Sequence, residues 1–160
     1  MSILRRLGVP FVAALVAAAI ATAVAPVRPP AVASGSPTAD LKPLVNSHEF
    51  MEHVVAGTFE LVKNGLRNKP PDARAWRSVR DASLLLGESG NLLLIRKPDD
   101  VDPSEWSRLS IGLREAGDAL TRTAKAKDFE ASRAAYSVLV RSCNECHTKY
   151  GDDGEPRIQP

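Results

Sequence analysis

Apolar and small residues recur every three or four positions in four separate segments of the chain. These segments cover residues 44–66, 76–93, 106–123 and 129–150. A spacing of three or four brings the recurring residues onto one face of an α-helix. No stretch alternates strictly between apolar and polar residues, as a half-buried strand would. The pattern therefore predicts four amphipathic helices and no sheet.

The same spacing defines the face of each helix that we expect to point inward. The inward face of the first segment comprises Leu44, His48, Met51, Val55, Phe59, Val62 and Leu66. That of the second comprises Trp76, Val79, Ser83, Leu86, Gly90 and Leu93. The inward face of the third segment comprises Trp106, Leu109, Leu113, Ala116, Leu120 and Thr123. That of the fourth comprises Phe129, Ser132, Tyr136, Leu139, Cys143, Cys146 and Tyr150. Gly87 and Gly90 weaken the second helix, so they either kink it or let a bulky group approach its backbone.

The connections between these segments are short and rich in helix-breaking residues. "NKPPDA" follows the first helix, and "RKPDDVDPSEW" separates the second from the third. Asp102 can cap the third helix, with Pro103 in its first turn and Glu105 completing a capping box. Asp128 can cap the fourth. Because short loops join antiparallel neighbours, the expected fold is all-α, an antiparallel up-down-up-down four-helix bundle.

The N-terminus differs from the rest of the chain. Arginines precede an apolar run from Leu7 to Ala25, and the small-residue stretch "AVAS" predicts cleavage after Ala33. The run is also about long enough to cross a bilayer, so it is either a cleaved signal peptide or a retained membrane anchor. In both cases the remainder is exported, to a periplasmic or other extracytoplasmic location.

The expected organisation therefore has four parts. Residues 1–33 are the signal segment, and residues 34–40 form a flexible leader. Residues 41–150 form the four-helix domain, and residues 151–160 form a polar tail. A formal net charge of +2 without any basic run gives no reason to expect a nucleic-acid partner.

The most specific motif is Cys143-Asn144-Glu145-Cys146-His147, which contains both cysteines of the chain. On a helix, residues three apart share one face, so each thiol can add to one vinyl group of a haem. His147 follows about 100° further round, where it can become the proximal ligand of the iron. The motif predicts one covalently bound haem c.

Three other kinds of site contain a pair of cysteines at this spacing. A disulfide between Cys143 and Cys146 would close a very short loop and leave His147 without a role. A zinc site could add His48 or His53 as fourth ligand, but the spacings usual for structural zinc are not met. A thioredoxin-like pair needs a βαβ context, which this sequence lacks.

A Cys-x-x-Cys-His motif at the end of the last helix of an exported bundle resembles the class II c-type cytochromes. These comprise cytochrome c-prime and its six-coordinate relatives of the cytochrome c-556 type, and the resemblance covers residues 41–150. It implies that Tyr150, three residues after the ligand histidine, packs against the haem edge. The chain departs from the family at Ser47 and His48, where an arginine often lies near a haem propionate. It departs again at Gly151, where a basic residue is usual.

The resemblance also implies that the distal ligand comes from the first helix. Met51 lies at the position of the methionine of the six-coordinate relatives, and Met/His ligation is a known haem c pairing. Met51 could instead be a core filler. His48, one turn earlier, is a candidate for a propionate contact or for bis-histidine ligation, whereas His53 is expected to face solvent.

The expected function is that of a one-electron carrier between larger redox proteins, which catalyses no net reaction by itself. The alternative is a five-coordinate haem protein of the cytochrome c-prime type that binds NO or CO. Related bundles often pair through their first two helices, so a homodimer is one assembly that the resemblance allows.

Overall fold

The computed structural model describes residues 41–151 and 157–159. The predicted signal segment and leader, residues 1–40, lie outside this part of the chain. In chain order the elements are α1 (Ser47–Phe50), η1 (Met51–Val55), α2 (Ala56–Gly65), α3 (Ala73–Leu93), η2 (Leu94–Arg96), α4 (Pro103–Ala126) and α5 (Phe129–Tyr150). Elements α1, η1 and α2 follow one another without an intervening loop, and we call them together the first helix.

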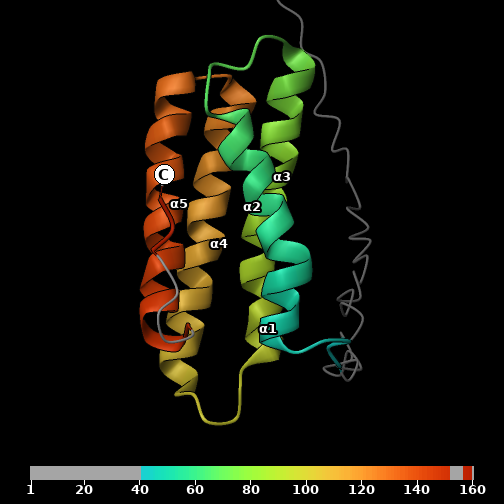
Figure 1. The fold of residues 1–160 in the computed structure, drawn as a ribbon, viewed down its shortest axis with the longest axis vertical. Coiled ribbons are helices and arrows are strands. Elements are labelled where there is room, and N and C mark those ends of the chain that lie inside the picture. The colour runs from blue at the N-terminus through green and yellow to red at the C-terminus, as the bar shows by residue number, and fades with distance from the viewer. Residues whose placement is uncertain (1–40, 152–156, 160) are drawn as a thin grey trace, which may run out of the picture. The chain divides into compact units, whose positions relative to one another are not determined.

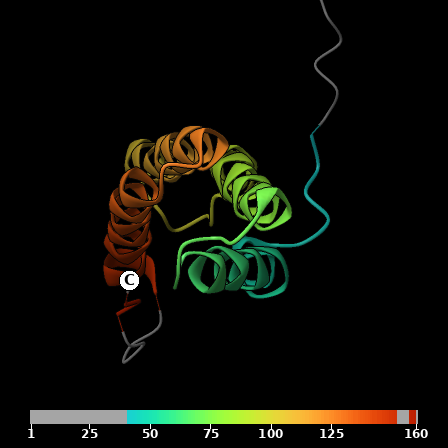
Figure 2. The ribbon, with the colours of Figure 1, turned by 90° about the horizontal axis from the view of Figure 1, so that it is seen from above.

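Four helices pack against one another, and the described residues contain no strand. In Figure 1 the first helix runs upward, α3 downward, α4 upward and α5 downward. Figure 2, seen along the helices, shows each one beside its neighbours in sequence, and the most extensive packing is between α3 and α4. The predicted antiparallel order of four helices is therefore confirmed. Within the described ranges, no helix is both long enough and apolar enough to cross a membrane.

A side-chain oxygen caps the beginning of each helix. Asn46 accepts a hydrogen bond from the backbone N–H three residues later, and Asp72, Asp102 and Asp128 do the same for α3, α4 and α5. These bonds satisfy backbone donors that have no partner inside the helix. The predicted caps at Asp102 and Asp128 are confirmed.

The inward faces of α3, α4 and α5 follow the predicted spacing closely. Each contributes at least one side chain that is fully removed from solvent, such as Leu86, Leu120 and Leu139. Burial of this size contributes roughly 1.5–3 kcal/mol for each large aliphatic side chain. Tyr136 is also fully buried and packs on Phe59 of the first helix with ring centroids 5.9 Å apart.

The prediction for the first helix was wrong at its beginning. Leu44 was expected to face inward, but it precedes the helix and is 98% exposed. His48 is exposed as well, whereas Phe50, which the pattern left out, is buried. The reason is a single wide turn from Met51 to Val55, in which the N–H of Ala56 donates to the carbonyl of Met51. A turn of this π type contains an extra residue, so it rotates everything before it relative to an ordinary α-helix.

The glycines of α3 allow a second backbone to approach. A Cβ atom added at Gly90 would lie 2.5 Å from the carbonyl oxygen of Ser110, and one added at Gly117 would collide with the backbone of Gly87. Of the two roles expected for Gly87 and Gly90, the close approach is therefore the one observed, and the group that approaches is helix α4.

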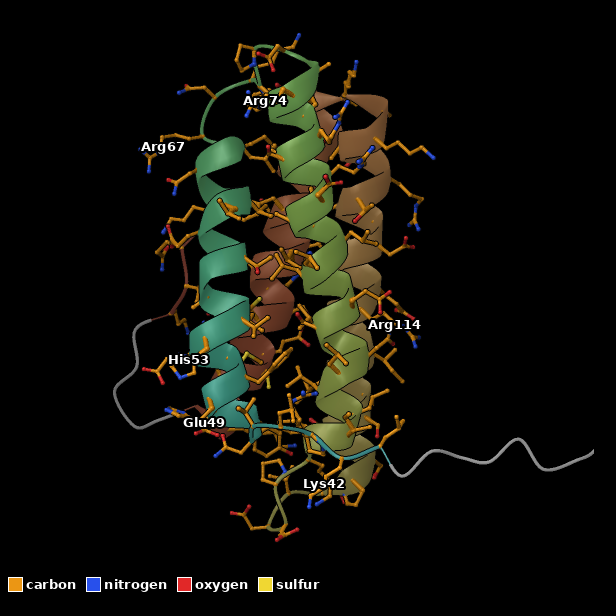
Figure 3. The ribbon with its side chains drawn as sticks, turned by 90° about the vertical axis from the view of Figure 1, so that its right-hand side faces the viewer. Lys42, Glu49, His53, Arg67, Arg74 and Arg114 are labelled. Carbon is orange, nitrogen blue, oxygen red and sulfur yellow. The ribbon has the colours of Figure 1, made fainter. Side chains whose placement is uncertain are left out.

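Charged side chains lie on the outside of the bundle. Figure 3 shows Arg67 and Arg74 near the loop between the first helix and α3, and Glu49 and His53 at the other end of the first helix. The solvated exterior and the apolar interior together explain why these four segments form a bundle.

Candidate functional site

A cavity of about 1120 Å³ lies at the end of the bundle where the first helix begins and α5 finishes. Its walls include Met51 and Val55 of the first helix and Cys143, Cys146 and His147 of α5. The volume is slightly above the range of about 300–1,000 Å³ that is usual for sites that hold a small molecule or a cofactor. The cavity therefore brings together residues that are about ninety positions apart in the chain.

The Cys-x-x-Cys-His motif occupies the last two turns of α5. Both cysteines are partly buried and are not joined in a disulfide. Helix α5 continues beyond them to Tyr150, and the N–H of Gly151 donates to the carbonyl of His147 at 3.0 Å. The three chemical groups of the motif therefore stand on a continuous, hydrogen-bonded helix, as the sequence predicts.

The environment of the two thiols is unfavourable to negative charge. Burial, followed by repulsion from Cys146 once that thiol ionises, raises the pKa of Cys143 to about 12. Burial also raises the pKa of Cys146, and the carboxylate of Glu105 adds to this effect. Both thiols are therefore protonated and uncharged at neutral pH. A thioether sulfur is uncharged too, so it suits this wall better than a thiolate ligand does.

Met51 is placed by the wide turn of the first helix. It is the first residue of η1, is partly buried, and packs against the core while lining the cavity. The hydroxyl of Thr58 donates to the carbonyl of Val54 at 2.7 Å, which satisfies one carbonyl of this irregular region. Single π turns inside α-helices occur often at functional sites, so this one draws attention to Met51.

Arg96 braces this end of the first helix. Its guanidinium carbon lies 4.4 Å from the centre of the Phe50 ring, and its Nη1 donates to the carbonyl of Leu92 at 2.7 Å. A cation over an aromatic face contributes about 0.5–1 kcal/mol or more. The contact fixes the residue directly before Met51 against the end of α3.

An aromatic pair forms another wall of the cavity. Trp106 donates its indole N–H to the carbonyl of Leu93 at 2.8 Å, which fixes the ring against the end of α3. Tyr150 packs on Trp106 with ring centroids 5.9 Å apart and planes inclined by 55°. Tyr150 is thus in the cavity wall. Its contact with a haem edge stays a prediction.

An ionic cluster ties the start of α4 to the end of α5. Glu105 accepts from Lys149 Nζ at 2.9 Å and from Arg108 Nε at 2.9 Å, and Arg108 also lies 3.8 Å from Glu145. The hydrogen bonds from Arg108 and Lys149 lower the pKa of Glu105 to about 2. The backbone N–H of Glu105 bonds to the cap residue Asp102, but its carboxylate is used in this cluster. The predicted capping box is therefore only half formed.

The two histidines of the first helix differ in position. His48 is exposed but lines the cavity, so a propionate contact or ligation by His48 stays a prediction. His53 does not line it. Its side chain is 69% exposed and lies 4.0 Å from Glu52. Figure 3 shows His53 on the outside of the first helix. The expectation that His53 faces solvent is confirmed.

The other interpretations of the motif find little support. The thiols of Cys143 and Cys146 are separate, so no disulfide closes the short loop. Among residues 41–151 and 157–159, no three His, Cys, Asp or Glu side chains gather closely enough to hold a metal ion. A haem needs only one protein ligand on each side of its plane, so this finding does not bear on haem.

Sequence reasoning missed one part of the cavity. Arg157, Ile158 and Gln159 belong to the tail that was expected to be merely polar, yet they line the cavity too. Asn144, between the two cysteines, bonds to the backbone of Ile158. The single apolar residue of the tail, Ile158, was the only sequence signal that could have indicated this contact.

Comparisons with protein-family models, with curated proteins and with solved structures found no match for this chain. Function is therefore inferred from the residues themselves. The cavity offers two uncharged thiols, an imidazole, a thioether and walls of apolar and aromatic side chains. This donor set fits the needs of a covalently attached haem with one histidine and one methionine ligand.

Proposed function

We propose that this chain is an exported c-type cytochrome that carries one electron at a time through a single covalently bound haem. Cys143 and Cys146 hold the ring by thioether bonds, His147 is the proximal ligand of the iron, and Met51 is the distal ligand. The observation that best supports this proposal is that Met51 and the Cys-x-x-Cys-His motif border one cavity of suitable size.

The bound haem supplies reversible one-electron chemistry at its iron. The residues of the chain orient it and exclude water. Val55, Leu109 and Leu113 are buried and line the cavity, so they keep its interior apolar. Two neutral ligands, an imidazole and a thioether, leave no open position for a substrate, which favours electron transfer over catalysis.

The proposed redox partners are larger proteins that approach the end of the bundle where the cavity lies. The ionic cluster of Glu105, Arg108 and Lys149 lies on this end. The side chains of Arg108 and Lys149 are both at least half exposed. Opposite charges in close contact leave little net charge there, so the surface gives no sign of a strongly charged partner. Export rests on the signal-like residues 1–33.

The experiment that tests the distal ligand compares the wild type with Met51→Leu, both produced with haem c maturation. Leucine is close to methionine in volume, so the exchange changes stability by less than about 1.5 kcal/mol. The oxidised wild type should be low spin with a methionine–iron band, and the reduced wild type should not bind CO. Met51→Leu should lose the band and bind CO when reduced.

His48→Ala is the matched control, because His48 lines the same cavity and is the other candidate for the sixth ligand. Its spectrum should equal that of the wild type. If the spectrum changed in His48→Ala and stayed the same in Met51→Leu, His48 rather than Met51 would be the sixth ligand. If the wild type itself bound CO, Met51 would be a lining residue and the five-coordinate, gas-binding alternative would be the better description.

A further inference from the structure

The last described residues return to the helix that carries the cysteines. Asn144 Nδ2 donates to the carbonyl of Ile158, and the N–H of Ile158 donates to Asn144 Oδ1, both at 2.9 Å. The side-chain amide thus pairs with both backbone groups of one residue, as a second peptide strand would. Such double pairing fixes the position of Ile158 along α5 as well as its distance from it.

Ile158 is held with its side chain toward the interior. It is partly buried, packs against the hydrophobic core and lines the cavity. Burial of an isoleucine from an otherwise polar tail is favourable by about 25 cal/mol for each Å² of apolar surface removed from water. Two independent interactions, hydrogen bonding and apolar burial, therefore hold residues 157–159 against the cavity.

The same three residues also bring a positive charge, that of Arg157, to the cavity. Lys149 and Lys63 also line it, but each is paired with a carboxylate, Lys149 with Glu105 at 2.9 Å and Lys63 with Glu60 at 3.5 Å. Within the described residues, the guanidinium of Arg157 has no carboxylate within ion-pair distance. It is therefore the cation best able to accept a new anionic partner at this cavity.

We propose that residues 157–159 form the outer wall of the haem site and that Asn144 is the positioning residue that holds this wall in place. The inference rests on the proposed function for the presence of haem. Ile158 shields the ring from water, and Arg157 pairs with a carboxylate of the haem propionates. Both effects disfavour the more highly charged oxidised iron, so the wall raises the reduction potential.

The first test is limited trypsin digestion of the haem-loaded protein, followed by mass spectrometry of the C-terminus. Trypsin cleaves after arginine, and the Arg157–Ile158 bond lies beside the two hydrogen bonds to Asn144. Proteolysis of a folded protein requires local opening. Loss of two hydrogen bonds should make cleavage after Arg157 roughly tenfold faster in Asn144→Ala.

Asn91→Ala is the matched control, since Asn91 is also a partly buried helical asparagine but bonds to Glu88 of its own helix. It should be cleaved at the wild-type rate. Equal rates in Asn144→Ala and the wild type would overturn the proposal.

The second test measures the midpoint potential of the same proteins and of two tail variants, Arg157→Gln and Ile158→Ala. The tail variants leave the attachment motif intact, so they remain informative if Asn144→Ala matures poorly. The potential should fall in Asn144→Ala and in both tail variants, and stay unchanged in Asn91→Ala. Faster cleavage with unchanged potentials would mean that the tail does not cover the haem, which overturns the inference. Absence of haem from the wild type would instead be the failure of the proposed function.

Discussion

The two sides of the bundle are built in opposite ways. On one side, α3 and α4 approach until their backbones touch at Gly87, Gly90 and Gly117. On the other side, the first helix and α5 hardly approach each other along their backbones and are joined by side chains such as Phe59 and Tyr136. The cavity lies on this second side, and Met51 borders it.

The difference teaches how a small four-helix bundle keeps an internal cavity. Glycines remove side chains where two helices must touch, so α3 and α4 form a rigid pair. On the other side, Met51 and Val55 of the wide turn η1 and both cysteines of α5 line the cavity. We expect changes on the first side to affect stability, and changes on the second side to affect the ligand set.

The largest expected effect is on the closely packed side. In Gly117→Ala, the new methyl group would collide with the backbone of Gly87, and the helices must move apart. We expect the free energy of unfolding to fall by about 2–3 kcal/mol, as in other overpacked cores. Urea unfolding of the haem-loaded protein measures this free energy.

The matched control is Gly57→Ala, where a Cβ atom would meet nothing within 4 Å. The higher helix propensity of alanine should raise the free energy of unfolding of this variant by about 0.5–1 kcal/mol. Equal effects of the two variants would contradict the close packing of α3 on α4.

The next effect concerns the wide turn on the cavity side. Deletion of His53 removes the extra residue of η1, so the residues before it should rotate by about 100°. Phe50 would then leave the core, at a cost of about 1.5–3 kcal/mol, and Met51 would no longer line the cavity. The oxidised spectrum should lose its methionine–iron band, and urea unfolding should show the loss of stability. His53→Ala keeps the residue count, so it should preserve both. Retention of the band in the deletion variant would show that the wide turn does not position Met51.

The smallest expected effect is at the ionic cluster between α4 and α5. The pKa of Glu105 is lowered to about 2, well below the value of about 4.3 in an unfolded chain. Its carboxylate therefore stabilises the fold fully above about pH 5. This contribution is lost as the pH falls toward 2. Glu105→Gln should be less stable than the wild type at pH 7, and the difference should shrink at pH 3 in low salt. Urea unfolding at both pH values tests this.

The matched control for this prediction is Glu115→Gln, because Glu115 is 72% exposed and lies 4.0 Å from Arg114. It should match the wild type at both pH values. A constant difference between Glu105→Gln and the wild type from pH 7 to pH 3 would mean that the ionised carboxylate of Glu105 is not what ties α4 to α5.

The helices with regular α-helical spacing could be predicted residue by residue. In α3, Trp76, Val79, Ser83 and Leu86 are all buried as the pattern indicates, because every turn of this helix contains 3.6 residues. The first helix could not be predicted in the same way. A periodicity of 3.6 cannot reveal a single wide turn, so Phe50 was missed.

Side-chain contacts that depend on the folded arrangement explain the other differences. The bonds between Asn144 and Ile158 join residues fourteen positions apart and leave no periodic signal. Glu105 was expected to complete a capping box, but two cations from other positions, Arg108 and Lys149, compete for its carboxylate. The attachment motif itself is local, so Cys143 and His147 could be chosen from the sequence alone. Their roles toward haem stay predictions.

The most direct measurement is the intact mass of the secreted protein, produced with haem c maturation and denatured before analysis. Covalent attachment through Cys143 and Cys146 predicts one species at the mass of the polypeptide plus one haem, and loss of this species when both cysteines are replaced by serine. A wild-type protein at the bare polypeptide mass, without the absorption of haem, would contradict the account.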